Sequence, residues 1–241
     1  MKPFAFSNFL PILYIILSAV HLYAEWVISE GLILVTKPLL LAILAMWVAV
    51  RLHPLQTRLS KFLLGALVFS LGGDIFLMLV NYGPRIDSLF LAGLGSFLIA
   101  QLCYAIVFWS FPGAKSGHIR KAFWKGWPFL MYLAAIIGTL WPGLSDGLRV
   151  PVVIYASSIT AMAVSGMNLR NALSREVYLG LMSGILLFLI SDSLIGLSKF
   201  RPDSFSLTAG RVWIMATYLG AQLLITANVL KGLSESDSTV R

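Results

Sequence analysis

Two carboxylates stand alone in long apolar stretches of the sequence. Asp74 is the single charge in "FSLGGDIFLML" (residues 69–79), and Asp192 lies in "LISDSLIGL" (residues 189–197). Burial in a low-dielectric environment favours the protonated form of a carboxyl group, and a second carboxylate nearby favours it further. Such a pair can divide the work between a proton donor and an ionised partner that stabilises a developing cation.

Other polar side chains fall on the same helical faces as these aspartates. Residues four or seven positions apart share one face of a helix. The three stripes of this kind are Ser70, Asp74 and Asn81; Asp192 and Lys199; and Arg211, Tyr218 and Gln222. At 1.5 Å per residue, Asp74, Asp192 and Lys37 lie about 8 Å inside the same end of their apolar runs. The pattern predicts a shared functional cavity, although a purely structural ion pair also fits these residue types.

The remaining candidates for chemistry are weaker. The histidines and the cysteine are scattered along the chain: His21, His53, His118 and Cys103. They form no cluster with metal-ligand spacing, so we expect no metal, no other cofactor and no internal disulfide. His21 is alone on an apolar run, which favours a hydrogen-bonded packing role. Glu25 lies at the end of the same run and Glu30 lies beyond it. Water is expected to solvate both carboxylates.

The composition places these residues in a membrane protein. Of the 241 residues, 59% are hydrophobic and 12% charged, and the mean hydropathy is +0.87, outside the range of water-soluble domains. A bilayer core needs roughly 20 apolar residues of helix, and the continuous runs exclude the alternation of a barrel strand. The eight predicted spans are Phe9 to Trp26, Leu32 to Val50, Phe62 to Val80, Ser88 to Ser110, Trp127 to Leu140, Val150 to Met167, Tyr178 to Leu197 and Ala209 to Leu230.

The Lys and Arg residues between these spans predict an orientation. Twelve fall on one side: Lys2, Arg51, Arg58, Lys61, Lys115, Arg120, Lys121, Lys125, Arg170, Arg175, Lys231 and Arg241. Five fall on the other: Arg85, Arg149, Lys199, Arg201 and Arg211. The positive-inside rule therefore predicts that both termini are cytoplasmic. The same distribution accounts for the net charge of +8, so we expect no nucleic-acid partner.

The predicted fold class is all-α, a polytopic membrane bundle of eight transmembrane helices. Residues 1–232 are expected to form a single domain, and residues 233–241 a polar disordered tail. The first apolar run is long for a signal peptide, which favours a retained helix. Short loops without soluble appendages favour a bacterial cytoplasmic membrane over the endoplasmic reticulum. Nothing in the sequence indicates the oligomeric state.

Two further patterns are typical of membrane helices. Gly180 and Gly184 in "GLMSG" have the spacing that lets such helices pack closely. Four tryptophans lie near the ends of the apolar runs, as an aromatic belt requires: Trp26, Trp109, Trp141 and Trp213.

Three residue pairs recur at a slowly growing separation of 113, 118 and 121 residues. They are Pro38 and Pro151, each expected to open a helix, Asp74 and Asp192, and Gln101 and Gln222. The pairs fit a weak 4+4 parallel repeat. Chance similarity between apolar helices also produces such matches, and no later inference depends on them.

Three passages are similar to those of a known family: "FSLGGDIFLM", "ISDSLIGLSKF" and "RVWIMATYLGAQLL". Together with "TKPLLL" and "QLCYAIVF", they resemble the YhhN-type lysoplasmalogenase family of eight-helix membrane proteins. The resemblance implies hydrolysis of the vinyl ether bond of a lysoplasmalogen, yielding a fatty aldehyde and glycerophosphocholine or glycerophosphoethanolamine. It implies that Asp74 and Asp192 are the characteristic acids. Lys37, Lys199, Tyr218 and Gln222 are the implied cavity residues.

The residues suit this chemistry. Vinyl ethers are cleaved by protonation of the β-carbon, so the enzyme needs a protonated acid and an anion beside the resulting oxocarbenium ion. Lys199 shares a helical face with Asp192 and favours its ionised form, so Asp74 is expected to donate the proton. Gly72 and Gly73 are expected to leave room beside Asp74. Lys37, Lys199 and Arg211 are suited to holding the lipid phosphate.

Two other classes of function use the same residues. Lone acids in membrane helices also suit a proton-coupled transporter of lipids or small molecules. A noncatalytic lipid-binding scaffold is the third possibility. Release of aldehyde by purified protein would distinguish the enzyme from both alternatives.

Overall fold

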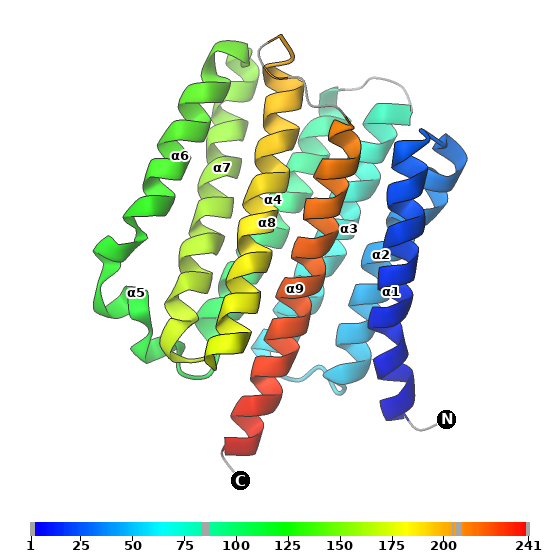
Figure 1. Cartoon of the computed structure of the whole chain (residues 1–241). Coiled ribbons are helices and arrows are strands. Elements are labelled where there is room, and N and C mark those ends of the chain that lie inside the picture. The colour runs from blue at the N-terminus through cyan, green and yellow to red at the C-terminus, as the bar shows by residue number, and fades with distance from the viewer. Residues whose placement is uncertain (1–2, 83–86, 204, 206–208, 240–241) are drawn as a thin grey trace. The chain divides into compact units, whose positions relative to one another are not determined.

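The part of the chain that the structure describes is built from helices and contains no strands (Figure 1). The computed structural model describes residues 3–82, 87–203, 205 and 209–239. Seven of the described helices are long and apolar enough to cross a membrane. The protein is therefore a multi-pass helical membrane bundle, which confirms the predicted fold class.

Two compact units divide the chain, Met1–Tyr104 and Ala105–Arg241. The boundary falls inside α4 (Asp87–Ser110), so the last turns of this helix belong to the second unit. The single domain predicted over residues 1–232 stays a prediction.

Four antiparallel helices make up the first unit: α1 (Pro3–Trp26), α2 (Glu30–Arg51), α3 (Arg58–Tyr82) and most of α4 (Figure 1). Helix α2 packs against both α1 and α3. The hydroxyl of Ser96 on α4 donates a hydrogen bond of 2.6 Å to the carbonyl oxygen of Phe69 on α3. Large side chains that are fully buried form the core, including Tyr14, Leu40, Leu44, Leu63 and Tyr104.

The second unit contains α6 (Trp127–Leu140), α7 (Asp146–Met167), α8 (Arg175–Phe200) and α9 (Gly210–Thr239). The short helix α5 (His118–Lys121) lies in the connection between α4 and α6. Helices α8 and α9 approach closely at the predicted glycines. A Cβ atom on Gly184 would lie 2.9 Å from the Cβ of Leu224, and one on Gly180 would lie 2.5 Å from Asn228. This confirms a packing role for the "GLMSG" motif.

Helix α6 has only 14 residues, which is short for a bilayer crossing. The 3₁₀ turn η2 (Phe123–Gly126) precedes α6 directly, and the 3₁₀ turn η3 (Trp141–Gly143) follows it directly. With a rise of about 2.0 Å per residue in 3₁₀ turns and 1.5 Å in α-helix, residues 123–143 extend over roughly 35 Å. This length suits an eighth crossing. The orientation with both termini cytoplasmic stays a prediction.

The observed helices differ from the predicted spans in their length and in the positions of two prolines. Seven of the predicted runs lie within helices, and the last begins one residue before α9 (Gly210–Thr239), which continues to Thr239 through residues assigned to a disordered tail. Pro38 and Pro151 were expected to open helices, yet both lie inside continuous helices, α2 and α7. Proline is tolerated inside membrane helices because neighbouring groups and local adjustments satisfy the freed carbonyl.

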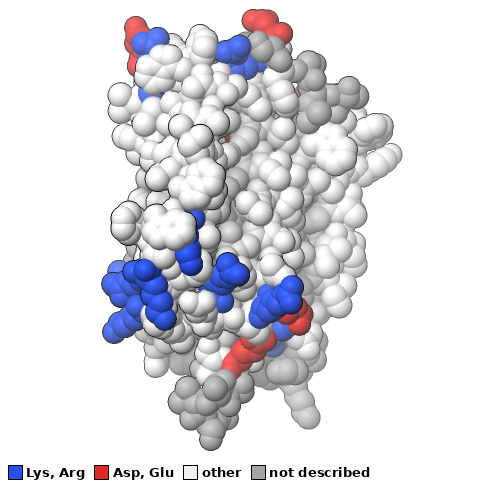
Figure 2. Space-filling model, turned by 60° about the vertical axis from the view of Figure 1, so that its left-hand side comes forward, with Lys and Arg blue, Asp and Glu red and all other residues white. Residues whose placement is uncertain are grey.

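The surface is arranged as a membrane protein requires. On the face in Figure 2, Lys and Arg side chains gather mainly toward one end, and a broad uncharged belt separates them from the charges at the other end. The tryptophans of the predicted aromatic belt are all exposed at helix ends: Trp26, Trp109, Trp141 and Trp213.

Replacing Gly184 with alanine should destabilise the protein, because the added methyl group would overlap Leu224 and Ile225 on α9. Overpacking of this kind typically costs about 1–3 kcal/mol. Thermal unfolding in one detergent provides the measurement. Gly138→Ala on α6 is the matched control, because no neighbouring atom lies within 4 Å of its added Cβ. Equal melting temperatures for the two variants would contradict the packing role.

Candidate functional site

A buried ion pair joins α2 and α3 in the first unit. Lys37 Nζ lies 3.7 Å from Asp74 Oδ1, and the side chains are only 13% and 4% exposed. Neither charge could be left in hydrocarbon alone without a cost of at least about 2.5–3.5 kcal/mol. The pairing of Lys37 with Asp74 therefore satisfies both groups in the interior of the unit.

Helix geometry explains why these two residues meet. Helices α2 and α3 are antiparallel neighbours joined by the loop between Arg51 and Arg58. Counted from that loop, Lys37 lies about 21 Å along α2 and Asp74 about 24 Å along α3, at 1.5 Å per residue. The two side chains consequently reach the same level.

A second polar group joins α1 to α2 at the adjacent position. His21 Nδ1 lies 2.7 Å from the hydroxyl oxygen of Thr36, and that hydroxyl donates its hydrogen to the carbonyl oxygen of Leu32. A hydroxyl has one hydrogen, so Thr36 must accept from His21, and Nδ1 carries a proton. His21 Nε2 then points toward Glu25, whose Oε1 lies 3.7 Å away.

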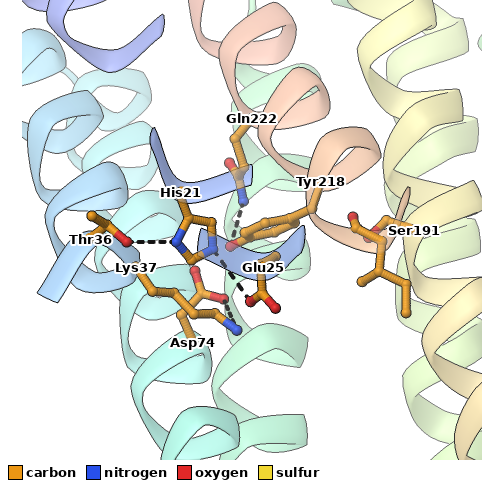
Figure 3. Close-up of polar contacts among 9 residues, drawn as sticks. His21, Glu25, Thr36, Lys37, Asp74, Ser191, Tyr218 and Gln222 are labelled. Atoms are coloured by element: carbon orange, nitrogen blue, oxygen red, sulfur yellow. Dashed lines mark hydrogen bonds and ion pairs between the residues drawn. The ribbon is translucent and has the colours of Figure 1, made fainter. Parts of the chain in front are cut away.

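Consecutive residues of α2 thus contact both neighbours: Thr36 binds His21 on α1, and Lys37 pairs with Asp74 on α3. In Figure 3 the side chains of these residues and Glu25 point into one region. His21 and Glu25 are buried, 0% and 6% exposed. The sequence pattern predicted that His21 is isolated and that water solvates Glu25. The predicted hydrogen bond of His21 is confirmed, but His21 is not isolated from other polar groups. The prediction that water solvates Glu25 is wrong.

The expectation that glycines leave room beside Asp74 is also wrong. A Cβ on Gly73 would lie 2.4 Å from the ring of Phe97, and one on Gly72 would lie 2.8 Å from Ser96 Oγ. Both contacts come from α4. The missing side chains therefore serve the close packing of α3 and α4.

Asp192 has its own polar surroundings in the second unit. The phenol of Tyr155 on α7 donates a hydrogen bond of 2.5 Å to Asp192 Oδ2. The hydroxyl of Tyr132 on α6 lies 2.9 Å from that of Ser193. Asp192 and Tyr155 are half-buried. Neither tyrosine was predicted from the sequence, because neither shares a helix with Asp192. Only the packing of α6, α7 and α8 brings them to Asp192 and Ser193.

The other predicted residues divide into buried and exposed groups. Ser70 is fully buried one turn from Asp74 on α3. Gln222 Nε2 donates a hydrogen bond of 3.3 Å to Tyr218 Oη, so these two residues of the predicted α9 stripe contact each other. Lys199 and Arg211 are exposed near helix ends. The side chain of Asn81 lies outside the described residues.

Within the described ranges, no group of three or more His, Cys, Asp and Glu side chains is arranged to hold a metal ion. The arrangement instead offers paired charges and tyrosine and histidine hydrogen bonds. Groups of this kind can hold, donate and accept protons inside a membrane.

Comparison with known proteins places the chain in a family. The model of the YhhN family matches residues 32–229. The chain belongs to the YhhN family. The matched range contains Lys37, Asp74, Tyr155 and Asp192, whereas His21 and Glu25 precede it.

One curated protein similar to this chain is lysoplasmalogenase TMEM86A of Homo sapiens. The two sequences are 32% identical over 182 residues, which cover 74% of this chain and 68% of the human protein. The Bos taurus protein of the same name is 30% identical over 183 residues, with the same coverage of both chains. A lysoplasmalogenase of Mycobacterium tuberculosis is 29% identical over 190 residues, or 77% of this chain and 66% of the relative. No solved structure matches the chain significantly.

Removing one member of the Lys37–Asp74 pair should destabilise the protein more than removing both. Breaking a buried pair typically costs about 3–5 kcal/mol because one charge is left uncompensated. Lys37→Met, Asp74→Asn and the double variant, compared by thermal unfolding, form a double-mutant cycle. Lys231→Met is the control, because its partner Glu176 is 83% exposed and exposed pairs contribute little. Strictly additive effects at Lys37 and Asp74 would contradict the pairing.

Proposed function

We propose that this protein is a lysoplasmalogenase, a membrane hydrolase that cleaves the vinyl ether bond of lysoplasmalogens. Its products would be a fatty aldehyde and glycerophosphocholine or glycerophosphoethanolamine. The observation that carries the proposal is the buried Lys37–Asp74 pair, in a chain whose curated relatives are named lysoplasmalogenases. Charges at membrane depth are costly and usually functional.

The reaction requires one proton donor and one anion. The acid transfers a proton to the β-carbon of the vinyl ether, and the electron pair of the double bond forms the new C–H bond. Water then adds to the resulting oxocarbenium carbon and loses a proton, which gives a hemiacetal. Collapse of the hemiacetal breaks the bond to the glycerol oxygen, which takes up a proton, and releases the aldehyde. Substrate and one water thus balance the two products.

The contact of Asp74 with Lys37 supports an assignment opposite to the one expected from sequence. The ammonium group of Lys37 lies beside Asp74 and stabilises its carboxylate form. Asp192 accepts a hydrogen bond from the phenol of Tyr155 on α7. In our proposal, Asp74 is the anion that stabilises the oxocarbenium ion, and Asp192 is the acid.

The exposed cations suit the polar end of the substrate. Lys199 and Arg211 lie near helix ends of the second unit. A guanidinium and an ammonium group are both good partners for a phosphate. We assign them to the phosphodiester of the lysolipid.

Purified protein in detergent should release aldehyde from a lysoplasmalogen and leave its saturated ether analogue intact, because only the vinyl ether has a β-carbon that can be protonated. Asp74→Asn and Asp192→Asn should each lower kcat/KM by about 10²–10⁴-fold, the usual contribution of a general acid or base. Asp146→Asn is the matched control, because the Asp146 side chain is 91% exposed. A folded Asp74→Asn, Asp192→Asn double variant with wild-type activity would refute the mechanism. Failure of the wild-type protein to release aldehyde, with proton-coupled uptake in sealed vesicles, would favour the transporter.

Tyr155→Phe should lower kcat/KM by about tenfold or more, because its hydrogen bond stabilises the carboxylate that forms as Asp192 gives up its proton, and a hydrogen bond to a charged group is worth about 1.5–3 kcal/mol. The pH profile of kcat/KM should shift as well, since the bond to Asp192 is lost. Tyr132→Phe is the control: its hydroxyl contacts neutral Ser193, so its activity and profile should stay close to the wild type. Indistinguishable profiles for the two variants would remove Tyr155 from the mechanism.

A further inference from the structure

The connection between α4 and α6 has an unusual composition. Residues 111–127, "FPGAKSGHIRKAFWKGW", contain four Lys or Arg residues and four aromatic residues. No Asp or Glu occurs anywhere between residues 88 and 145. We call residues 114–127 the basic-aromatic segment.

A buried asparagine fixes the backbone of this segment. Asn168 Oδ1 accepts hydrogen bonds of 3.1 Å from the backbone N–H groups of both Ile119 and Arg120. Its Nδ2 donates one of 2.9 Å to the carbonyl oxygen of Ala114. Gly117 lies directly against the same amide, where a Cβ would be 2.2 Å from Oδ1. Asn168 is fully buried, so its hydrogen bonds fix the segment in place within the second unit.

The anchored backbone turns its apolar residues inward and its cations and rings outward. Ala114 and Ile119 are buried, whereas Phe123 is 83%, Trp124 62% and Trp127 58% exposed. Arg120 lies over the ring of Trp109, and Lys125 over the ring of Trp124, both at 5.8 Å.

One cation of the segment and one outside it act electrostatically on the same histidine. The pKa of His118 is lowered, first by partial desolvation and then by the charges of Lys125 and Arg170. Lys125 and Arg170 therefore act on the same point, although they come from η2 and from η4 (Asn168–Asn171).

We propose that the basic-aromatic segment, together with Arg170 of η4, is a binding site for an anionic phospholipid, with Arg120, Lys125 and Arg170 holding the phosphate and Phe123, Trp124 and Trp127 lying in the interfacial layer. Charge complementarity identifies the ligand, because the site has several cations and no acidic residue of its own. The rings identify it as a lipid, because they stand at the start of the helical stretch 123–143. Aromatic rings at such a position lie at headgroup level, where basic residues attract anionic lipids.

The test measures binding of dioleoyl phosphatidylglycerol and dioleoyl phosphatidylcholine to the full-length protein, by native mass spectrometry from a neutral detergent. Phosphatidylglycerol should bind more tightly, and high salt should weaken its binding. The variant Arg120→Gln, Lys125→Gln, Arg170→Gln should bind it on the order of 100-fold more weakly, at about fivefold per charge. The variant Phe123→Ser, Trp124→Ser should also weaken binding.

A charge-matched control neutralises three exposed cations outside the segment, Arg51, Arg58 and Lys61, and should bind phosphatidylglycerol nearly as well as the wild type. Glycerol 3-phosphate serves as the soluble probe with the same phosphate chemistry, and it should not compete at equal concentration. Equal affinity for the two lipids, equal loss in both triple variants, or full competition by glycerol 3-phosphate would each overturn the proposal. Melting temperatures close to the wild type would show that the variants are folded.

Discussion

A charged side chain inside a bilayer has no water to solvate it, and this constraint shapes the first unit of the protein. Lys37 and Asp74 lie well inside their helices, and each is stabilised by the other. Their contact requires α2 and α3 to be antiparallel neighbours at one particular level along their axes. The interaction therefore fixes the register of two helices whose apolar surfaces would otherwise slide with little change in free energy.

The same constraint extends to α1. His21 and Glu25 are also buried, and the hydroxyl of Thr36 connects this pair to α2. Because Thr36 and Lys37 are consecutive residues, α2 carries polar contacts to both of its neighbours at nearly one depth. Three helices thus share a polar level within an otherwise apolar unit.

Small residues have a complementary role in both units. Gly73 admits the ring of Phe97 on α4, and Gly184 admits the backbone of α9. Helix association in a membrane depends on van der Waals contact rather than on the hydrophobic effect. A glycine therefore favours association, because it lets the neighbouring helix approach more closely than a larger residue would. Gly73 lies next to Asp74 in sequence, yet its structural partner is an aromatic ring on another helix.

Much of the fold could be predicted because it depends on local composition. Apolar runs of sufficient length form membrane helices wherever they occur, and the predicted spans Ser88 to Ser110 and Trp127 to Leu140 end at the same residues as the observed helices. The end of α9 at Thr239 and the positions of Pro38 and Pro151 inside helices were not predicted. Packing, rather than local propensity, maintains these helices.

The sequence by itself determined which residues are costly to bury: Asp74, Asp192 and Lys37 are conspicuous because a bilayer excludes unpaired charge. Only the tertiary structure decided their partners. The pairing of Lys37 with Asp74, the burial of Glu25 beside His21 and the bond from Tyr155 to Asp192 all join different helices or depend on what covers them. Spacing along one helix predicts which residues share a face. It carries no information about which neighbouring helix that face meets, because that depends on how side chains from distant parts of the chain fit together.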